Sequence, residues 1–142
     1  MPTRTATATW NGGLKGGNGD FRGNTGMSGS YSFGSRFEQA SGSNPEELLA
    51  AAEAACYSMA LSGALEKNGT PSTKVETTAK CTVEKVGDGF SITSMDLDVR
   101  ALVPNLDDAT FQRIATATKE GCPVSRALSG IPNIRLTATL QR

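Results

Sequence analysis

Three cysteines supply most of the reactive chemistry that this sequence offers: Cys56, Cys81 and Cys122. The chain contains no histidine, which excludes Ser-His and Cys-His catalysis, histidine general bases and nearly all catalytic zinc sites. A cysteine attacks as a thiolate, so without imidazole it needs a nearby guanidinium or ammonium group to stabilise that anion. Arginine and lysine are therefore the groups expected to activate a cysteine here.

The three cysteines differ in their expected surroundings. Cys56 lies in an alanine-rich apolar segment, where a cysteine is most often a packing residue. Cys122 lies between Gly121 and Pro123, at the start of a short predicted helix, a position that favours the thiolate and leaves the sulfur accessible. Cys81 lies within a predicted strand and is expected to be structural. The odd number leaves at least one cysteine unpaired, so a redox role is worth testing.

A long helix is predicted from residue 45 to about residue 67. The segment Ser43–Glu47 supplies an N-cap, a proline at the first helical position and two acids in the first turn. Asn68-Gly69 suits the C-terminal cap. Between Leu48 and Leu65 the only charged residue is Glu53, so the helix has little solvated surface. A membrane span is disfavoured by the alanine content and by Glu53, and cover from a second subunit is favoured, which predicts a homodimer.

The rest of the pattern predicts an α+β fold in one domain, residues 1–142. Strands are expected at 3–10, 29–34, 74–86, 90–103 and 133–140, and the third and fourth form an antiparallel hairpin at Gly87-Asp88-Gly89. A second helix covers 107–121 and a short one 123–128. The order of the main elements is β-β-α-β-β-α-β, which indicates an α+β fold.

The balance of charges and the N-terminal residues indicate which partners and which compartment to expect. Fourteen Lys and Arg balance fourteen Asp and Glu, so no surface suited to nucleic acid or to an acidic membrane is expected. The first six residues lack the apolar core of a secretory signal, which favours the cytoplasm.

Four segments carry a resemblance to one known family: Arg36–Glu38, Gly42–Leu48, Ala54–Ala60 and Gly121–Ser125. The family is that of osmotically inducible protein C and organic hydroperoxide resistance protein (OsmC/Ohr), and the resemblance, closest to the OsmC branch, extends over nearly the whole chain. It implies an intertwined homodimer, with antiparallel sheets packed on two long central helices and two active sites at the subunit interface.

The resemblance also implies roles for four residues. Cys56 would attack the peroxide, Cys122 would resolve the oxidised form, and Arg36 with Glu46 would poise Cys56. Glu46 and Cys56 are ten residues apart on one helix, about 15 Å along its axis and roughly 80° around it, so they cannot touch directly. Glu46 must act through the length of a guanidinium group or come from the partner's helix, and we favour the partner.

The implied activity is a cysteine-based peroxidase that reduces organic or fatty-acid hydroperoxides to alcohols. A Cys56 sulfenic acid would condense with Cys122 to a disulfide, which an external dithiol such as dihydrolipoamide or a lipoylated protein would reduce, with no metal or bound cofactor. Apolar residues near Cys56, including Met59 and Leu61, are expected to line the substrate pocket.

Two alternatives belong to other classes. The first is a redox-inactive small-molecule-binding or structural stress protein on the same fold, because fold alone does not confer activity. The presence together of Cys56, Cys122, Arg36 and Glu46 favours the peroxidase over it. The second is a thiol acyltransferase or hydrolase using Cys56, for which the chain offers no evident general base.

Overall fold

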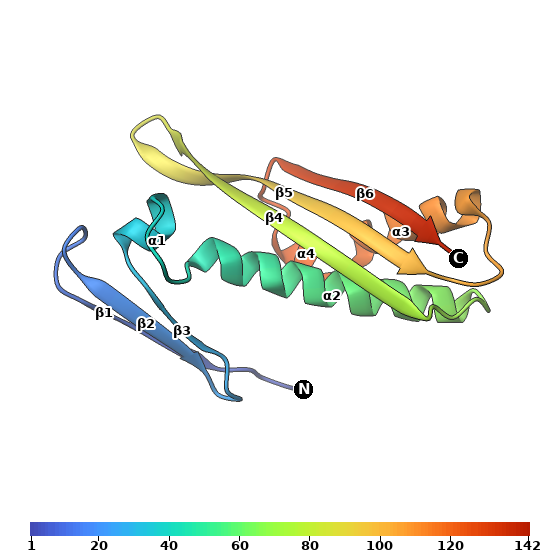
Figure 1. The fold of residues 1–142 in the computed structure, drawn as a ribbon, viewed down its shortest axis with the longest axis horizontal. Helices are drawn as coiled ribbons and strands as arrows, with labels where there is room; N and C mark the ends of the chain where they lie inside the picture. The colour runs from blue at the N-terminus through green and yellow to red at the C-terminus, as the bar shows by residue number, and fades with distance from the viewer. The chain divides into compact units, whose positions relative to one another are not determined.

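The computed structural model describes all 142 residues, which form two compact units, Met1–Leu48 and Leu49–Arg142. We call these the N-terminal unit and the C-terminal unit. As predicted, the chain is of the α+β class, with two separate three-stranded sheets. Figure 1 shows the elements of each unit in chain order.

The N-terminal unit is built on a small antiparallel sheet in the order β1-β2-β3. Its strands are β1 (Ala6–Asn11), β2 (Asn18–Gly23) and β3 (Ser28–Tyr31), and a short helix, α1 (Phe33–Phe37), follows. Strand β2 escaped prediction because its glycines and asparagine have low strand propensity. Position 19 requires glycine, because a Cβ on Gly19 would lie 2.7 Å from the Tyr31 ring and 2.8 Å from the Trp10 ring.

The C-terminal unit contains the second sheet, in the order β4-β5-β6. Strands β4 (Lys74–Val86) and β5 (Gly89–Leu102) form the predicted antiparallel hairpin. Strand β6 (Asn133–Gln141) pairs with β5 in parallel, so the expectation of purely antiparallel sheets is wrong for this pair. The reason is the connection: α3 (Asp108–Gly121) and α4 (Pro123–Ala127) lie between the two strands, and such a helical crossover is what a parallel pair needs.

The longest helix is α2 (Pro45–Lys67), as the capping pattern predicts. The side-chain oxygen of Asn44 accepts a hydrogen bond from the backbone N–H of Glu47 at 2.8 Å, and Pro45 occupies the first helical position. By length and composition α2 is the one helix that could cross a membrane, a test that the core helix of a soluble protein also passes. Met59 on this helix is 81% exposed within the single chain.

The core of the C-terminal unit lies between its sheet and its helices (Figure 1). Alternate residues of β5 point inward, and they pack against apolar side chains of α2 and α3; the buried set includes Met95, Leu97, Val99, Ala101, Tyr57, Leu61, Leu65, Phe111, Ile114 and Ala115. The buried Tyr57 hydroxyl donates to the backbone oxygen of Ala115 at 2.8 Å. This contact ties α2 to α3 next to Cys56, and so fixes where the end of α3 meets that cysteine.

Candidate functional site

In the N-terminal unit, Arg36 and Glu46 form a salt bridge. The guanidinium Nη2 donates to Oε1 of Glu46 at 2.8 Å, and Nε lies 3.2 and 3.3 Å from the two carboxylate oxygens. The Glu46 side chain is 5% exposed and the Arg36 side chain 37% exposed. Glu46 therefore pairs with Arg36 of its own chain, whereas we had favoured a Glu46 supplied by the partner.

Local hydrogen bonds hold the two members of this salt bridge in place. Ser32 and Ser35 form a reciprocal capping box that starts α1, the helix carrying Arg36. The Ser35 hydroxyl also donates to the backbone oxygen of Ser43 at 2.7 Å, and the Asn44 side chain donates to the backbone oxygen of Ser35 at 3.2 Å. Helix α1 is thereby fixed to the start of α2, where Glu46 lies.

In the C-terminal unit, the structure brings Cys56 and Cys122 together. Their Sγ atoms are 3.0 Å apart, and both residues are thiols. Cys56 lies in the middle of α2, whereas Cys122 is both the C-cap of α3 and the N-cap residue of α4. The expectation of an accessible Cys122 sulfur is wrong: the residue is 1% exposed, because the turn from α3 to α4 packs it against α2. Cys81 lies elsewhere, on β4.

The surroundings of Cys56 within this unit raise its pKa above the ordinary value. Burial is the largest cause, followed by the hydrogen bond with the Cys122 side chain, and the charge of Glu53 acts in the same direction. A hydrogen bond from the backbone N–H of Val124 acts in the opposite direction. A thiol in these surroundings is a weak nucleophile, and a positive charge close to the sulfur would be needed to activate it.

A buried carboxyl group, Glu53, lies one helical turn before Cys56 and was not among the residues predicted for the site. Glu53 is wholly buried, and its Oε1 accepts a short hydrogen bond from the Ser125 hydroxyl on α4. Its Oε2 has no hydrogen-bond partner. The sequence does contain a signal for it, because Glu53 is the only acid between Leu48 and Leu65. A lone charge in an apolar helix is rarely buried without a function or a partner.

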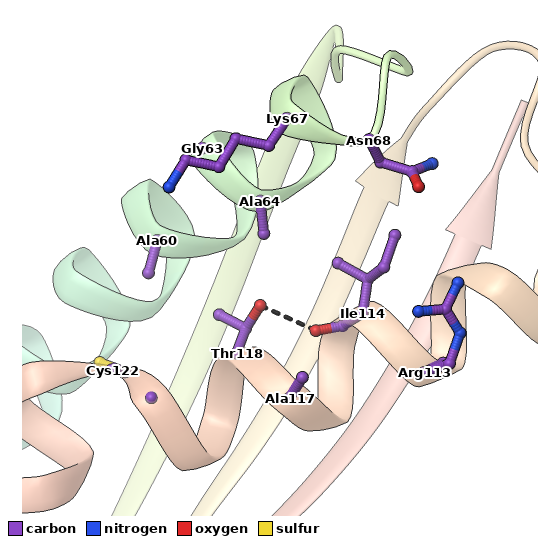
Figure 2. Close-up of a pocket in the computed structure, with 11 residues that line it drawn as sticks. Ala60, Gly63, Ala64, Lys67, Asn68, Arg113, Ile114, Ala117, Thr118 and Cys122 are labelled. Atoms are coloured by element: carbon purple, nitrogen blue, oxygen red, sulfur yellow. Dashed lines mark hydrogen bonds between the residues drawn. The ribbon is translucent and has the colours of Figure 1, made fainter.

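A cavity of about 630 Å³ opens between α2 and α3, with the Cys122 sulfur at one end (Figure 2). Its walls are mainly small or apolar, with two cations and an amide among them; the lining residues are Ala60, Gly63, Ala64, Lys67, Asn68, Arg113, Ile114, Ala117, Thr118, Gly121 and Cys122. Met59 and Leu61, which were expected to line the substrate pocket, do not line this cavity: Met59 is exposed and Leu61 belongs to the core. No group of three or more Cys, Asp or Glu side chains is arranged to hold a metal ion.

Comparison with known proteins gives consistent matches. Residues 38–137 match the family model described as OsmC-like protein, a range that contains Glu46, Cys56 and Cys122 and begins just after Arg36. The chain is 44% identical over 123 residues to peroxiredoxin OsmC of Escherichia coli strain K12, covering 85% of this chain and 86% of that protein. It is 34% identical over 101 residues to the organic hydroperoxide resistance protein of Xanthomonas axonopodis pv. citri, covering 70% and 67%.

The fold is also found among solved structures. The crystal structure of an organic hydroperoxide resistance protein from Elizabethkingia anophelis superimposes with a TM-score of 0.70 at 25% identity, covering all of this chain and 97% of the other. This agreement covers the α+β arrangement of strands and helices described above.

Proposed function

The chain belongs to the OsmC-like protein family, and from that premise we propose that it reduces organic hydroperoxides to alcohols through a Cys56 sulfenic acid and a Cys56–Cys122 disulfide. The names of its relatives, peroxiredoxin and organic hydroperoxide resistance protein, support a peroxidase role in general. The specific chemistry rests on the residues of this chain.

The observation that carries the proposal is the 3.0 Å separation of the two Sγ atoms. Sulfurs in a disulfide lie about 2.05 Å apart, so a shift of about 1 Å is enough to join them. Cys56 lies within α2 and Cys122 in the turn between α3 and α4, 66 residues further along the chain, and their sulfurs are in contact. Their placement suits a pair that passes between thiol and disulfide.

The first step is attack of the Cys56 thiolate on the distal oxygen of the hydroperoxide. The O–O bond breaks, the alkoxide takes a proton and leaves as an alcohol, and Cys56 becomes a sulfenic acid. Cys122 then attacks that sulfur, forming the disulfide and releasing water. This second step protects Cys56 from irreversible oxidation by further peroxide.

Activation of Cys56 is assigned to Arg36. The pKa of Cys56 is raised by its own unit, and a guanidinium beside the sulfur would oppose that rise. The salt bridge with Glu46 supports this role, because it orients Arg36 and leaves its Nη1 nitrogen uncommitted to Glu46. Glu46 thus acts on Cys56 through the guanidinium group of Arg36.

Three further assignments complete the proposal. The protein is a homodimer, since apolar residues of α2 such as Met59 are exposed in a single chain. An external dithiol such as dihydrolipoamide or a lipoylated protein regenerates the enzyme by thiol–disulfide exchange. The reaction takes place in the cytoplasm, where thiols are kept reduced between turnovers.

Intact mass spectrometry tests the reaction directly. After one equivalent of cumene hydroperoxide, the protein should lose about two mass units as the dithiol becomes a disulfide, and cumyl alcohol should appear in equal amount. Peptide mapping should place the bond between Cys56 and Cys122. An unchanged mass with unconsumed hydroperoxide would instead favour the redox-inactive binding protein.

A further inference from the structure

Glu53 and Ser125 form a second buried contact beside the two sulfurs. Glu53 precedes Cys56 by three residues on α2, and Ser125 follows Cys122 by three residues on α4. Residues three apart on a helix are neighbours on its surface, so the carboxyl–hydroxyl contact lies about one turn from the sulfur–sulfur contact. The same two segments of the chain carry both contacts.

The hydrogen bonding of Glu53 suits a carboxylic acid. The side chain is wholly buried, it takes part in no ion pair, and only Oε1 has a hydrogen-bond partner. A buried carboxylate without a cation or a second donor is costly, whereas a protonated Oε2 carries no charge and is itself a donor. In its acid form, Glu53 would carry a proton about one helical turn from the Cys56 sulfur.

We propose that Glu53 is the proton donor for disulfide formation, an inference that rests on the proposed peroxidase function. Cys122 attacks the sulfur of the Cys56 sulfenic acid, so that an S–S bond forms and the S–O bond breaks. The departing hydroxyl takes the Glu53 proton and leaves as water, and the thiol proton of Cys122 restores the acid. The Cys56 sulfur is reduced as the Cys122 sulfur is oxidised, and the hydroperoxide of the first step is the only oxidant. The chain has no histidine to do this work.

A purely structural role for Glu53 makes a different prediction. If the carboxyl served only to hold α4 against α2, the hydrogen bond with Ser125 would be what matters. Glu53→Gln keeps an oxygen that accepts this hydrogen bond and removes the acidic proton. Ser125→Ala keeps the acid and removes the hydrogen bond. The two variants therefore separate proton donation from attachment of the helices.

The experiment follows a single turnover with cumene hydroperoxide by rapid quench and intact mass. In Glu53→Gln we expect sulfenic acid to form at the rate of the unmodified protein and then accumulate, with disulfide formation slowed by about 100-fold, the low end for general acid–base catalysis. Ser125→Ala should form the disulfide without such accumulation. The matched control is Glu66→Gln, the same change on an exposed residue of α2, which should behave as the unmodified protein.

The possible outcomes distinguish failure of the inference from failure of the proposed function. Normal disulfide formation in Glu53→Gln, or slow formation in Ser125→Ala alone, overturns the proton-donor role. If Glu53→Gln fails to fold, the test is made on the unmodified protein. Its rate of disulfide formation should fall by about twofold in heavy water, because a proton is transferred in that step, and an unchanged rate overturns the proposal. If the unmodified protein forms neither sulfenic acid nor disulfide, the peroxidase function itself fails.

Discussion

Arg36 binds Glu46 through two of its nitrogens, with Nη2 2.8 Å and Nε 3.2 Å from the same carboxylate oxygen. An arginine held in this way has a fixed orientation, and its third nitrogen, Nη1, remains for another anion. In the proposed mechanism that anion is the thiolate of Cys56.

Arg36→Ala should slow the reaction of Cys56 with iodoacetamide near neutral pH by about tenfold or more. A cation close to a thiolate lowers its pKa by about one to three units, and losing it reduces the thiolate present at a given pH. Alkylation of the Cys81→Ser background, followed by mass spectrometry, measures the rate. Arg135→Ala, which removes an arginine paired with Asp96 on the second sheet, is the control. An unchanged rate in Arg36→Ala would remove this residue from the mechanism.

Glu46→Gln should reduce peroxide turnover less than Arg36→Ala does, because the guanidinium stays but is less firmly oriented. It should also lower the free energy of unfolding by about 1 kcal/mol, a value that allows for the partial exposure of Arg36. Urea denaturation and a peroxide-consumption assay give the two quantities. The exposed Glu47→Gln provides a neighbour for comparison. Full activity in Glu46→Gln would mean that orientation of Arg36 is unimportant.

Cys122→Ser should leave Cys56 unprotected after its first oxidation. With excess hydroperoxide the protein should gain about 16 mass units and then more, as sulfenic acid passes to sulfinic and sulfonic acids. Cys56→Ser should not consume peroxide at all, and Cys81→Ser should behave as the unmodified protein. If Cys81→Ser were the inactive variant, the assignment of the two cysteines would be wrong.

Cys122→Ala should shift the alkylation of Cys56 to lower pH. The hydrogen bond and the charge of Cys122 both raise the pKa of Cys56, so their removal lowers it and increases the thiolate fraction at any pH below the midpoint. The rate of alkylation measured from pH 6 to pH 10 gives that midpoint. A midpoint at or above that of the unmodified protein would contradict this reading of the sulfur pair.

Tyr57→Phe should destabilise the protein at neutral pH by about 1 kcal/mol, because the backbone oxygen of Ala115, which lies within α3, loses its second donor, the tyrosine hydroxyl. Burial raises the pKa of Tyr57 well above its ordinary value of 10.0. The folded state thus holds this proton more tightly, so its stabilising contribution is complete below about pH 10 and is lost as the pH rises further. Urea unfolding at several alkaline pH values should show a shallower decline in Tyr57→Phe than in the Tyr31→Phe control.

Local signals in the sequence predict much of the fold. The start of α2 follows from the cap and proline at residues 44 and 45, and the β4–β5 hairpin from its Gly-Asp-Gly turn, because each signal acts within a few residues. The parallel pairing of β6 has no such signal, since its alternating pattern is the same for either strand direction.

The candidate site, like the fold, contains residues that the sequence indicates and contacts that it does not. The resemblance to the family pointed to Cys56, Cys122, Arg36 and Glu46, and the structure shows two close pairs among them. The contact of Glu53 with Ser125 was not predicted, because it joins residues 72 apart and nothing near either residue specifies the other. The burial of Cys122 likewise depends on how the turn between α3 and α4 packs, which its glycine and proline neighbours do not reveal.

The 66-residue separation of Cys56 and Cys122 has a thermodynamic consequence. A covalent bond between them would turn β4, β5 and α3 into a closed ring and restrict the unfolded chain, an entropic effect of about 4 kcal/mol for a loop of this size. In each catalytic cycle the protein would then alternate between a dithiol form with a lower free energy of unfolding and a cross-linked form that unfolds less readily in heat or in the presence of proteases. Exposure to peroxide would thus increase the stability of the protein while the protein consumes that peroxide.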